Sequence, residues 1–324
     1  MPERTNHAIH EQQLNYIFLT IALLAALVLG ACQPSQNITT EAPSQKFDGQ
    51  RAYQDVVYQT NLGPRLAGTE AHTKIRAWIN QELTNAGWTV EEQNTTYFNQ
   101  PVINVIAKST PTIDPNRPWI ILGAHYDSRM VSDQDPDPAK HLTPVPGAND
   151  GASGVAVLVE LGRTLPKDIE TQVWLVFFDA EDNGELPGYD WILGSQAFVE
   201  SLQGKPEAAV VVDMIGDADL NIYYEKNSDQ QLSESIFNTA ASLGYTKQFV
   251  PEPRFRMLDD HLPFVQAGIR AVDLIDFDYP YWHTTSDTAD KVSAESLMAV
   301  GDTLSNWLQN QPLAVPSEKS TPYP

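Results

Sequence analysis

The sequence predicts a single α/β domain built on a mixed, mostly parallel β-sheet. Short apolar runs rich in β-branched residues alternate with segments whose apolar residues recur at helical spacing, which is the order typical of such sheets. The run at residues 173–178 is apolar throughout, as expected of a strand that helices bury on both faces. No internal repeat and no linker rich in proline and glycine divides residues 47–310, so we expect one domain over this range.

The N-terminal segment has the features of an export signal. Residues 16–29 form an apolar run that is short for a membrane span but suits the hydrophobic region of a signal peptide. The run ends in LGAC at residues 29–32, which resembles the lipobox of bacterial lipoproteins. We therefore expect residues 1–32 to be a lipoprotein-type signal peptide, with the mature protein lipid-anchored through Cys32 in the bacterial cell envelope. An uncleaved anchor is the alternative, and the polar residues 33–46 are expected to form a flexible linker.

Composition excludes several classes of function. The formal net charge is -22, and no run of lysine and arginine supplies the phosphate neutralisation that nucleic acid binding requires. Cys32 is the only cysteine, so the chain can form neither an intrachain disulfide nor a zinc site built from thiolates. We expect no nucleic acid partner, and contact with a membrane only through the lipid.

Two helices are expected to open the folded domain. Residues 48–61 have a helical pattern and are followed by a turn at residues 62–65. In residues 69–86 the apolar side chains recur at helical spacing, with Thr69 as a plausible N-cap and Gly87 as the stop.

Strands are expected next. Residues 88–97 and 102–108 have strand composition, and the short apolar run at residues 119–122 predicts a strand that leads into His125. The polar and proline-rich residues 129–146 are expected to form a loop.

Beyond that loop, helices and strands alternate to the end of the domain. We expect helices at residues 151–165, 191–202, 231–243, 261–267 and 294–309, and strands at residues 173–178, 208–215, 220–224 and 271–275. Residues 311–324 have few apolar side chains and are expected to be a disordered tail.

Polar side chains gather at the predicted ends of strands, which is the edge where open α/β sheets bind ligands. Asp179, Glu181 and Asp182 follow the strand at residues 173–178, and three neighbouring carboxylates repel one another unless a cation or hydrogen bonds offset them. Other polar residues placed near strand ends are His125, Asp127, Asp150, Asp213 and His283. Carboxylates and imidazoles without thiolate suit a catalytic zinc ion.

Six motifs along the chain resemble those of the M28 zinc aminopeptidases and their relatives, the glutaminyl-peptide cyclotransferases. They are HYDSR at 125–129, PGANDGASG at 146–154, FFDAED at 177–182, VVDMIG at 211–216, DDHLPF at 259–264 and WHTTSD at 282–287. The resemblance covers residues 53–308 and implies the phosphorylase/hydrolase-like fold, a twisted sheet with helices on both faces. It also implies a zinc-dependent enzyme that acts on peptide or protein N-termini.

The resemblance implies one or two bound zinc ions. Asp150, Asp182 and His283 match the ligands of one ion, and Asp150 matches the bridge to a second. His125 and Asp213 match the other ligands of the two-metal members. The family usually has glutamate where this chain has Asp182, so we expect the metal closer to the strand end or bound through one oxygen.

The resemblance also assigns residues around the metal. Asp127 matches a carboxylate that orients His125, and Glu181 matches the general acid/base.

Three features resemble the cyclotransferases more than the aminopeptidases. The connection from Asp182 to residues 193–195 is long. Asp259, the first residue of the DDH motif, matches a carboxylate that shares a hydrogen-bond network with Asp213 in the cyclotransferases. Trp282 matches an indole of their glutaminyl pocket, and Trp191 in the long connection is a second candidate for the pocket wall.

The expected activity is therefore conversion of N-terminal glutamine to pyroglutamate with release of ammonia. The alternative is an M28 aminopeptidase that hydrolyses N-terminal residues. A non-catalytic binding protein is the third possibility. The intact set of ligands argues against it, because buried charges without partners are costly and a retired site has no reason to keep them.

Overall fold

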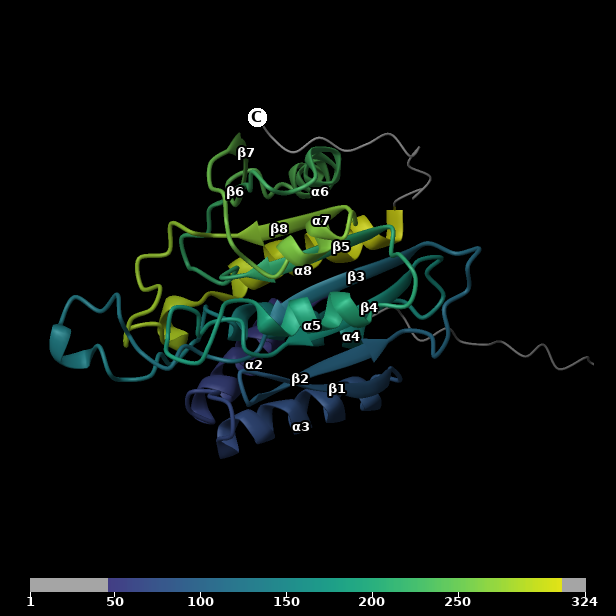
Figure 1. The fold of residues 1–324 in the computed structure, drawn as a ribbon. Helices are drawn as coiled ribbons and strands as arrows, with labels where there is room; N and C mark the ends of the chain where they lie inside the picture. The colour runs from purple at the N-terminus through teal and green to yellow at the C-terminus, as the bar shows by residue number, and fades with distance from the viewer. Residues whose placement is uncertain (1–45, 311–324) are drawn as a thin grey trace, which may run out of the picture. The chain divides into compact units, whose positions relative to one another are not determined.

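A mixed, mostly parallel sheet forms the centre of the domain in the computed structural model, which describes residues 46–310. In this range the main sheet has six strands in the order β1-β2-β4-β3-β5-β8 (Figure 1). The strands are β1 (Thr89–Tyr97), β2 (Gln100–Lys108), β3 (Trp119–His125), β4 (Gln172–Phe178), β5 (Ala208–Asp213) and β8 (Ala271–Ile275). Strands β4, β3, β5 and β8 pair in parallel, whereas β2 pairs antiparallel with β4 and with β1. The predicted fold class is confirmed.

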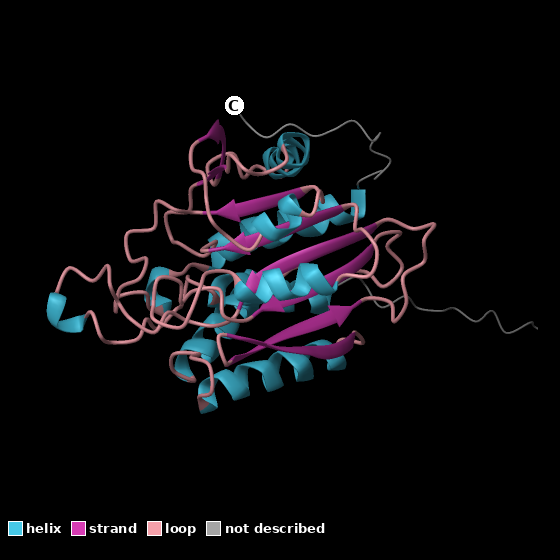
Figure 2. Cartoon of the chain, viewed as in Figure 1, coloured by secondary structure: helices cyan, strands magenta, loops and turns pink. Residues whose placement is uncertain are grey.

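Helices cover both faces of this sheet (Figure 2). They are α2 (Gly49–Asn61), α3 (Glu70–Asn85), α4 (Ala152–Thr164), α5 (Leu193–Ser201), α6 (Gln230–Ser242), α7 (Leu262–Gln266) and α8 (Ala294–Asn310). Alternate residues of a strand point to opposite faces, so β3 contributes to two cores. Ile120 and Leu122 lie in the larger core with residues of α2, α3, α4 and α8. Ile121 lies in a second core with Phe198 of α5 and Phe264 of α7.

A small parallel pair, β6 (Ile222–Tyr224) and β7 (Phe249–Pro253), lies outside the main sheet. Strand β7 was not expected, because Pro251 and Pro253 argue against a strand in sequence. It is tolerated here because β7 is paired only on the side that faces β6. Two short 3-10 helices, η1 (Pro138–Lys140) and η2 (Ala289–Lys291), were also not expected.

Element boundaries differ from expectation mainly near the polar strand ends. Helix α5 begins at Leu193 and not at 191, because Ile192 has a left-handed φ of 56°. Strand β5 ends at Asp213 and not at 215, since Met214 has a φ of 48°. Thr69 caps α3 as predicted, its hydroxyl accepting a hydrogen bond from the His72 N–H.

Residues 1–45 and 311–324 lie outside the described residues. The signal peptide, the lipidated Cys32, almost all of the linker and the C-terminal tail therefore stay predictions. Among residues 46–310, no helix combines the length and the apolar character needed to cross a membrane.

Candidate metal centre

The carboxyl ends of neighbouring strands bring five candidate ligands together. His125 is the last residue of β3 and Asp213 is the last residue of β5, which pairs with β3. Asp182 follows β4, the other neighbour of β3. Asp150 precedes α4, and His283 lies on the segment between β8 and η2. All five side chains are buried.

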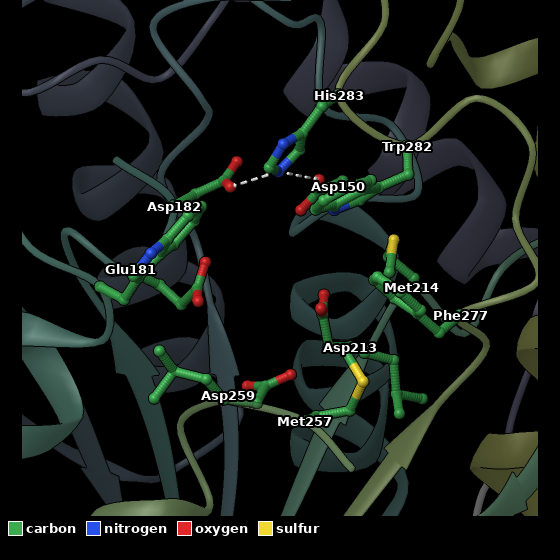
Figure 3. Close-up of a pocket in the computed structure, with 13 residues that line it drawn as sticks. Asp150, Glu181, Asp182, Asp213, Met214, Met257, Asp259, Phe277, Trp282 and His283 are labelled. Carbon is green, nitrogen blue, oxygen red and sulfur yellow. Dashed lines mark hydrogen bonds and ion pairs between the residues drawn. The ribbon is translucent and has the colours of Figure 1, made fainter. Parts of the chain in front are cut away.

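These residues form two ligand groups that share Asp150. In the first group, Nε2 of His283 is 2.8 Å from an oxygen of Asp182 and 3.7 Å from one of Asp150 (Figure 3). In the second, Nε2 of His125 is 3.1 Å from an oxygen of Asp150 and 3.1 Å from one of Asp213. Within each group the potential ligand atoms lie within 4.8 Å of one another, so each group can close around one cation.

Left-handed backbone recurs at this edge of the sheet. Ala180, Met214 and His283 have φ values of 52°, 48° and 54°. Residues other than glycine adopt this conformation at a cost of order 1–3 kcal/mol, and such residues cluster at functional sites. Each of the three is a candidate ligand or lies within two residues of one, so the left-handed positions coincide with the candidate ligands.

Asp127 contacts two of the segments that carry candidate ligands. Its carboxylate accepts hydrogen bonds from the backbone N–H groups of Glu181 and Asp182, at 3.1 and 3.3 Å. The same carboxylate lies 3.4 Å from Nδ1 of His125. Asp127 thus ties the end of β3 to the turn after β4.

Two further residues hold the segment that carries Asp150. The fully buried guanidinium of Arg65 donates to the carbonyl oxygens of Pro146 and Gly147, at 2.6 and 2.7 Å. The carboxylate of Asp287 accepts hydrogen bonds from the Asn149 and Asp150 N–H groups.

Sequence reasoning did not single out either residue. Asp287 is the last residue of the WHTTSD motif, so the motif was a signal that could have identified it. Arg65 was placed only in the turn at residues 62–65, and its role gave no signal because its partners are backbone carbonyls, which every residue type carries.

Asp179, the first of the three acids after β4, belongs to neither ligand group. Its carboxylate lies 2.8 Å from Nε2 of His72 and accepts the Ile103 N–H at 2.8 Å. Hydrogen bonds offset its charge, so Asp179 joins α3 and β2 to the end of β4.

Electrostatics at the site reflect many buried acids. Burial raises the pKa of Asp182 to about 6 and that of Asp213 to about 7. Burial raises the pKa of Glu181 well above its usual value, and the charges of Asp182 and Asp259 add to this. Burial alone would lower the pKa of His125, but the surrounding carboxylates raise it well above its usual value. The site therefore favours positive charge at its centre.

The donor set fits zinc. Asp150 and Asp182 both belong to the first ligand group, and each has one buried carboxylate oxygen without a hydrogen-bond partner. A buried acceptor without a partner is costly, and coordination to a cation would satisfy it. Imidazole nitrogen and carboxylate oxygen are zinc ligands, and the shorter side chain of Asp182 still reaches the group.

A small pocket opens on the first ligand group. Its volume is about 190 Å³, below the roughly 300–1,000 Å³ of drug-sized pockets. Trp191, Trp282 and Phe277 contribute apolar surface, and Glu181 contributes its carboxylate. Both indoles stack on the His283 ring. The distance between ring centroids is 6.1 Å for Trp191 and 3.8 Å for Trp282. The pocket is suited to one apolar or amide side chain.

Asp259 also lines this pocket, near Asp213 (Figure 3). No hydrogen bond joins the side chains of these two described residues; instead, the like charge of Asp259 adds to burial in raising the pKa of Asp213. Asp259 belongs to a third buried group with His261 and Asp273, whose potential ligand atoms also lie within 4.8 Å of one another.

Comparison with known proteins places the chain in a family. The model of peptidase family M28 matches residues 104–308. The chain belongs to peptidase family M28. The family match and the solved relatives support the conclusion that it is a zinc-dependent enzyme.

Relatives of this M28 chain include both cyclases and peptidases. It is 26% identical to a glutaminyl-peptide cyclotransferase of Drosophila melanogaster over 71% of its length and 72% of the relative's. A solved glutaminyl cyclase of Porphyromonas gingivalis is 33% identical, with a TM-score of 0.75, over 81% of this chain and 98% of that one. A solved zinc-dependent exopeptidase of Parabacteroides distasonis is 30% identical, with a TM-score of 0.76, over 83% of this chain and 100% of that one.

Proposed function

We propose that the chain is a zinc-dependent glutaminyl-peptide cyclotransferase, which converts N-terminal glutamine of peptides and proteins to pyroglutamate and ammonia. The small pocket carries this proposal, because aromatic walls meet a complete ligand group and the Glu181 carboxylate within it. Its volume suits a single side chain and not an extended peptide. The export signal expected at residues 1–32 would place the substrates outside the cytoplasmic membrane.

The residues of the pocket divide the work of the reaction. Asp150, Asp182 and His283 would hold zinc, whose chemistry there is Lewis-acid polarisation of the γ-amide carbonyl. The indoles of Trp191 and Trp282 exclude water from the glutaminyl side chain and hold it against the ligand group. Exclusion of water favours attack by the substrate's own amine over hydrolysis.

Glu181 is the proposed proton carrier. The α-amine nitrogen attacks the γ-carbonyl carbon, a C–N bond forms, and the bond to the amide nitrogen breaks. Glu181 takes a proton from the attacking amine and gives it to the departing nitrogen, which leaves as ammonia. Its raised pKa supports this role, because proton transfer is most efficient from a group whose pKa is near the working pH.

Aminopeptidase activity is the second candidate function. The observation that favours it is the second ligand group of His125, Asp150 and Asp213, which resembles the set used by two-metal peptidases. With two ions bound, Glu181 would accept a proton from water instead of from the substrate amine.

A pair of peptides separates the two functions. The zinc-loaded protein is incubated with a Gln-initiated peptide and with the same peptide initiated by leucine, and products are followed by mass spectrometry. We expect the first to lose ammonia and the second to remain intact. Stepwise release of N-terminal residues from either peptide would overturn the cyclase proposal in favour of the peptidase.

A further inference from the structure

The loop between β3 and α4 packs against the segment that carries His283. The Gln134 N–H donates to the His283 carbonyl oxygen at 3.2 Å. The Asp135 carboxylate accepts from the Thr285 N–H and hydroxyl, at 3.0 and 2.6 Å. These contacts fix the backbone from His283 to Thr285, and the neighbouring Asp133 lies beside the His283 ring.

The Asp133 carboxylate faces the nitrogen of His283 that points away from the ligand group. One of its oxygens lies 3.4 Å from Nδ1, while Nε2 faces Asp182 and Asp150. Arg129 fixes this carboxylate with two hydrogen bonds, at 2.9 and 2.8 Å. Arg129 also donates to the Asp182 carbonyl oxygen at 2.8 Å, so one cation connects Asp133 to a second candidate ligand.

The same relation occurs at the other histidine of the site. Nδ1 of His125 is 3.4 Å from a carboxylate oxygen of Asp127, and its Nε2 faces Asp150 and Asp213. A histidine that binds a metal through one nitrogen commonly donates the other N–H to a carboxylate, which fixes the tautomer and the ring orientation. Both candidate histidine ligands therefore have a carboxylate behind them, each from a different part of the β3–α4 region.

We propose that Asp133 is the positioning residue of His283. It accepts the Nδ1–H and thereby keeps the Nε2 lone pair directed at the ligand group. This inference rests on the proposed function only in taking His283 as a metal ligand. It does not depend on whether the enzyme cyclises or hydrolyses its substrate.

A purely structural role for Asp133 makes a different prediction. Its side chain is 37% exposed, whereas the side chain of Arg129, its ion-pair partner, is 2% exposed. Because the guanidinium is buried, loss of its carboxylate partner is expected to destabilise this loop. If the pair only tied down the loop, removing the carboxylate would act on zinc binding through Arg129 and Asp182, and it would leave the His283 Nδ1–H signal unchanged.

The test measures zinc affinity directly. Asp133→Asn keeps the shape and removes the charge, and Asp133→Ala removes the side chain. Asp137→Asn is the matched control, because Asp137 lies in the same loop but only caps η1. Zinc dissociation constants are obtained by competition with a chelator at fixed pH, and circular dichroism and melting of the metal-free proteins check the fold.

We expect both Asp133 variants to bind zinc about 10- to 100-fold more weakly than the wild type, with the control unchanged. Proton NMR of the zinc-loaded protein should show the hydrogen-bonded His283 Nδ1–H of the wild type, and Asp133→Asn should weaken that signal or shift it. Either wild-type zinc affinity in both Asp133 variants or an unshifted Nδ1–H signal in Asp133→Asn would overturn the proposal.

The outcome is separable from the proposed reaction. If glutamine is not cyclised but zinc affinity falls and the Nδ1–H signal shifts in Asp133→Asn, the cyclase proposal fails and the role of Asp133 holds. If glutamine is cyclised but zinc affinity does not change, the cyclase proposal holds and the proposed role of Asp133 fails. Should Asp133→Ala fail to fold, Asp133→Asn alone decides, because it leaves the volume of the loop unchanged.

Discussion

Glu181 differs from the other buried acids of the site in the surroundings of its backbone N–H and of its carboxylate. Its backbone N–H is bound by Asp127, whereas its carboxylate lines the pocket and belongs to neither ligand group. A group fixed through the backbone, with a free carboxylate next to the bound substrate, is suited to carrying protons.

Replacing this group by its amide tests that role. Glu181→Gln should lower turnover by about 10²- to 10⁴-fold, because the amide keeps the shape but cannot carry the proton. Zinc content and melting temperature should stay at wild-type values. Glu252→Gln, an exposed change on β7, serves as the control and should leave activity unchanged. Full activity in Glu181→Gln would remove the acid/base assignment.

At the residue scale, sequence reasoning located the candidate ligands but missed residues that act on them. Hydrophobic runs show where strands end, so the sequence alone places His125, Asp182 and Asp213 at one edge of the sheet. Asp133 lay in a segment expected only to be a loop, and its contact with His283 spans 150 positions of sequence. Such a contact leaves no local pattern, since it depends on how the loop folds back.

Helices and strands position the candidate ligands through close packing. Helix α4 begins two residues after Asp150 and lies against β3 and β5, whose last residues are His125 and Asp213. At Gly154 an added Cβ would lie 2.5 Å from the Val212 carbonyl oxygen and 2.9 Å from the Ala124 Cβ. The absence of a side chain there allows the helix to approach both strand ends.

Gly154→Ala should therefore destabilise the protein by about 1–3 kcal/mol through overpacking. Because the strained contacts adjoin His125 and Asp213, we expect weaker zinc binding as well. Asn238→Ala, an exposed change on α6, is the control and should be close to neutral. Chemical unfolding measures the first effect and chelator competition the second. A neutral or stabilising Gly154→Ala would show that α4 has room to move.

Most elements could be predicted because their signals are local. The alternation of strands and helices, and caps such as Thr69, depend on neighbouring residues. Strand β7 was missed because its prolines are compatible only with an edge, and edge position is a property of the assembled sheet. The start of α5 was misplaced because the left-handed Ile192 has no signature in an apolar side chain.

Over the whole molecule, acidic groups outnumber basic ones, 42 to 20, and several are buried. Asp276, outside the ligand groups, is an example: burial raises its pKa to about 7. The pKa of aspartate in an unfolded chain is about 4, so the folded protein holds this proton more tightly. The resulting stabilisation is fully present below about pH 4 and is lost as the pH rises through about 7.

Asp276→Asn should therefore flatten the pH dependence of stability. Between about pH 4 and 7, the free energy of unfolding of the wild type should fall relative to that of the variant, by at most about 1.4 kcal/mol per pH unit. Urea unfolding at a fixed zinc concentration measures this difference, and the exposed Asp168→Asn serves as the control. Parallel pH profiles for wild type and Asp276→Asn would contradict the expectation.

The central claim is that Asp150, Asp182 and His283 bind one zinc ion beside Glu181. Anomalous diffraction from crystals of the zinc-loaded protein, recorded on both sides of the zinc absorption edge, tests it most directly. We predict a zinc peak about 2.0–2.2 Å from ligand atoms of all three side chains. Zinc peaks elsewhere in the protein, with none between these three residues, would contradict the claim.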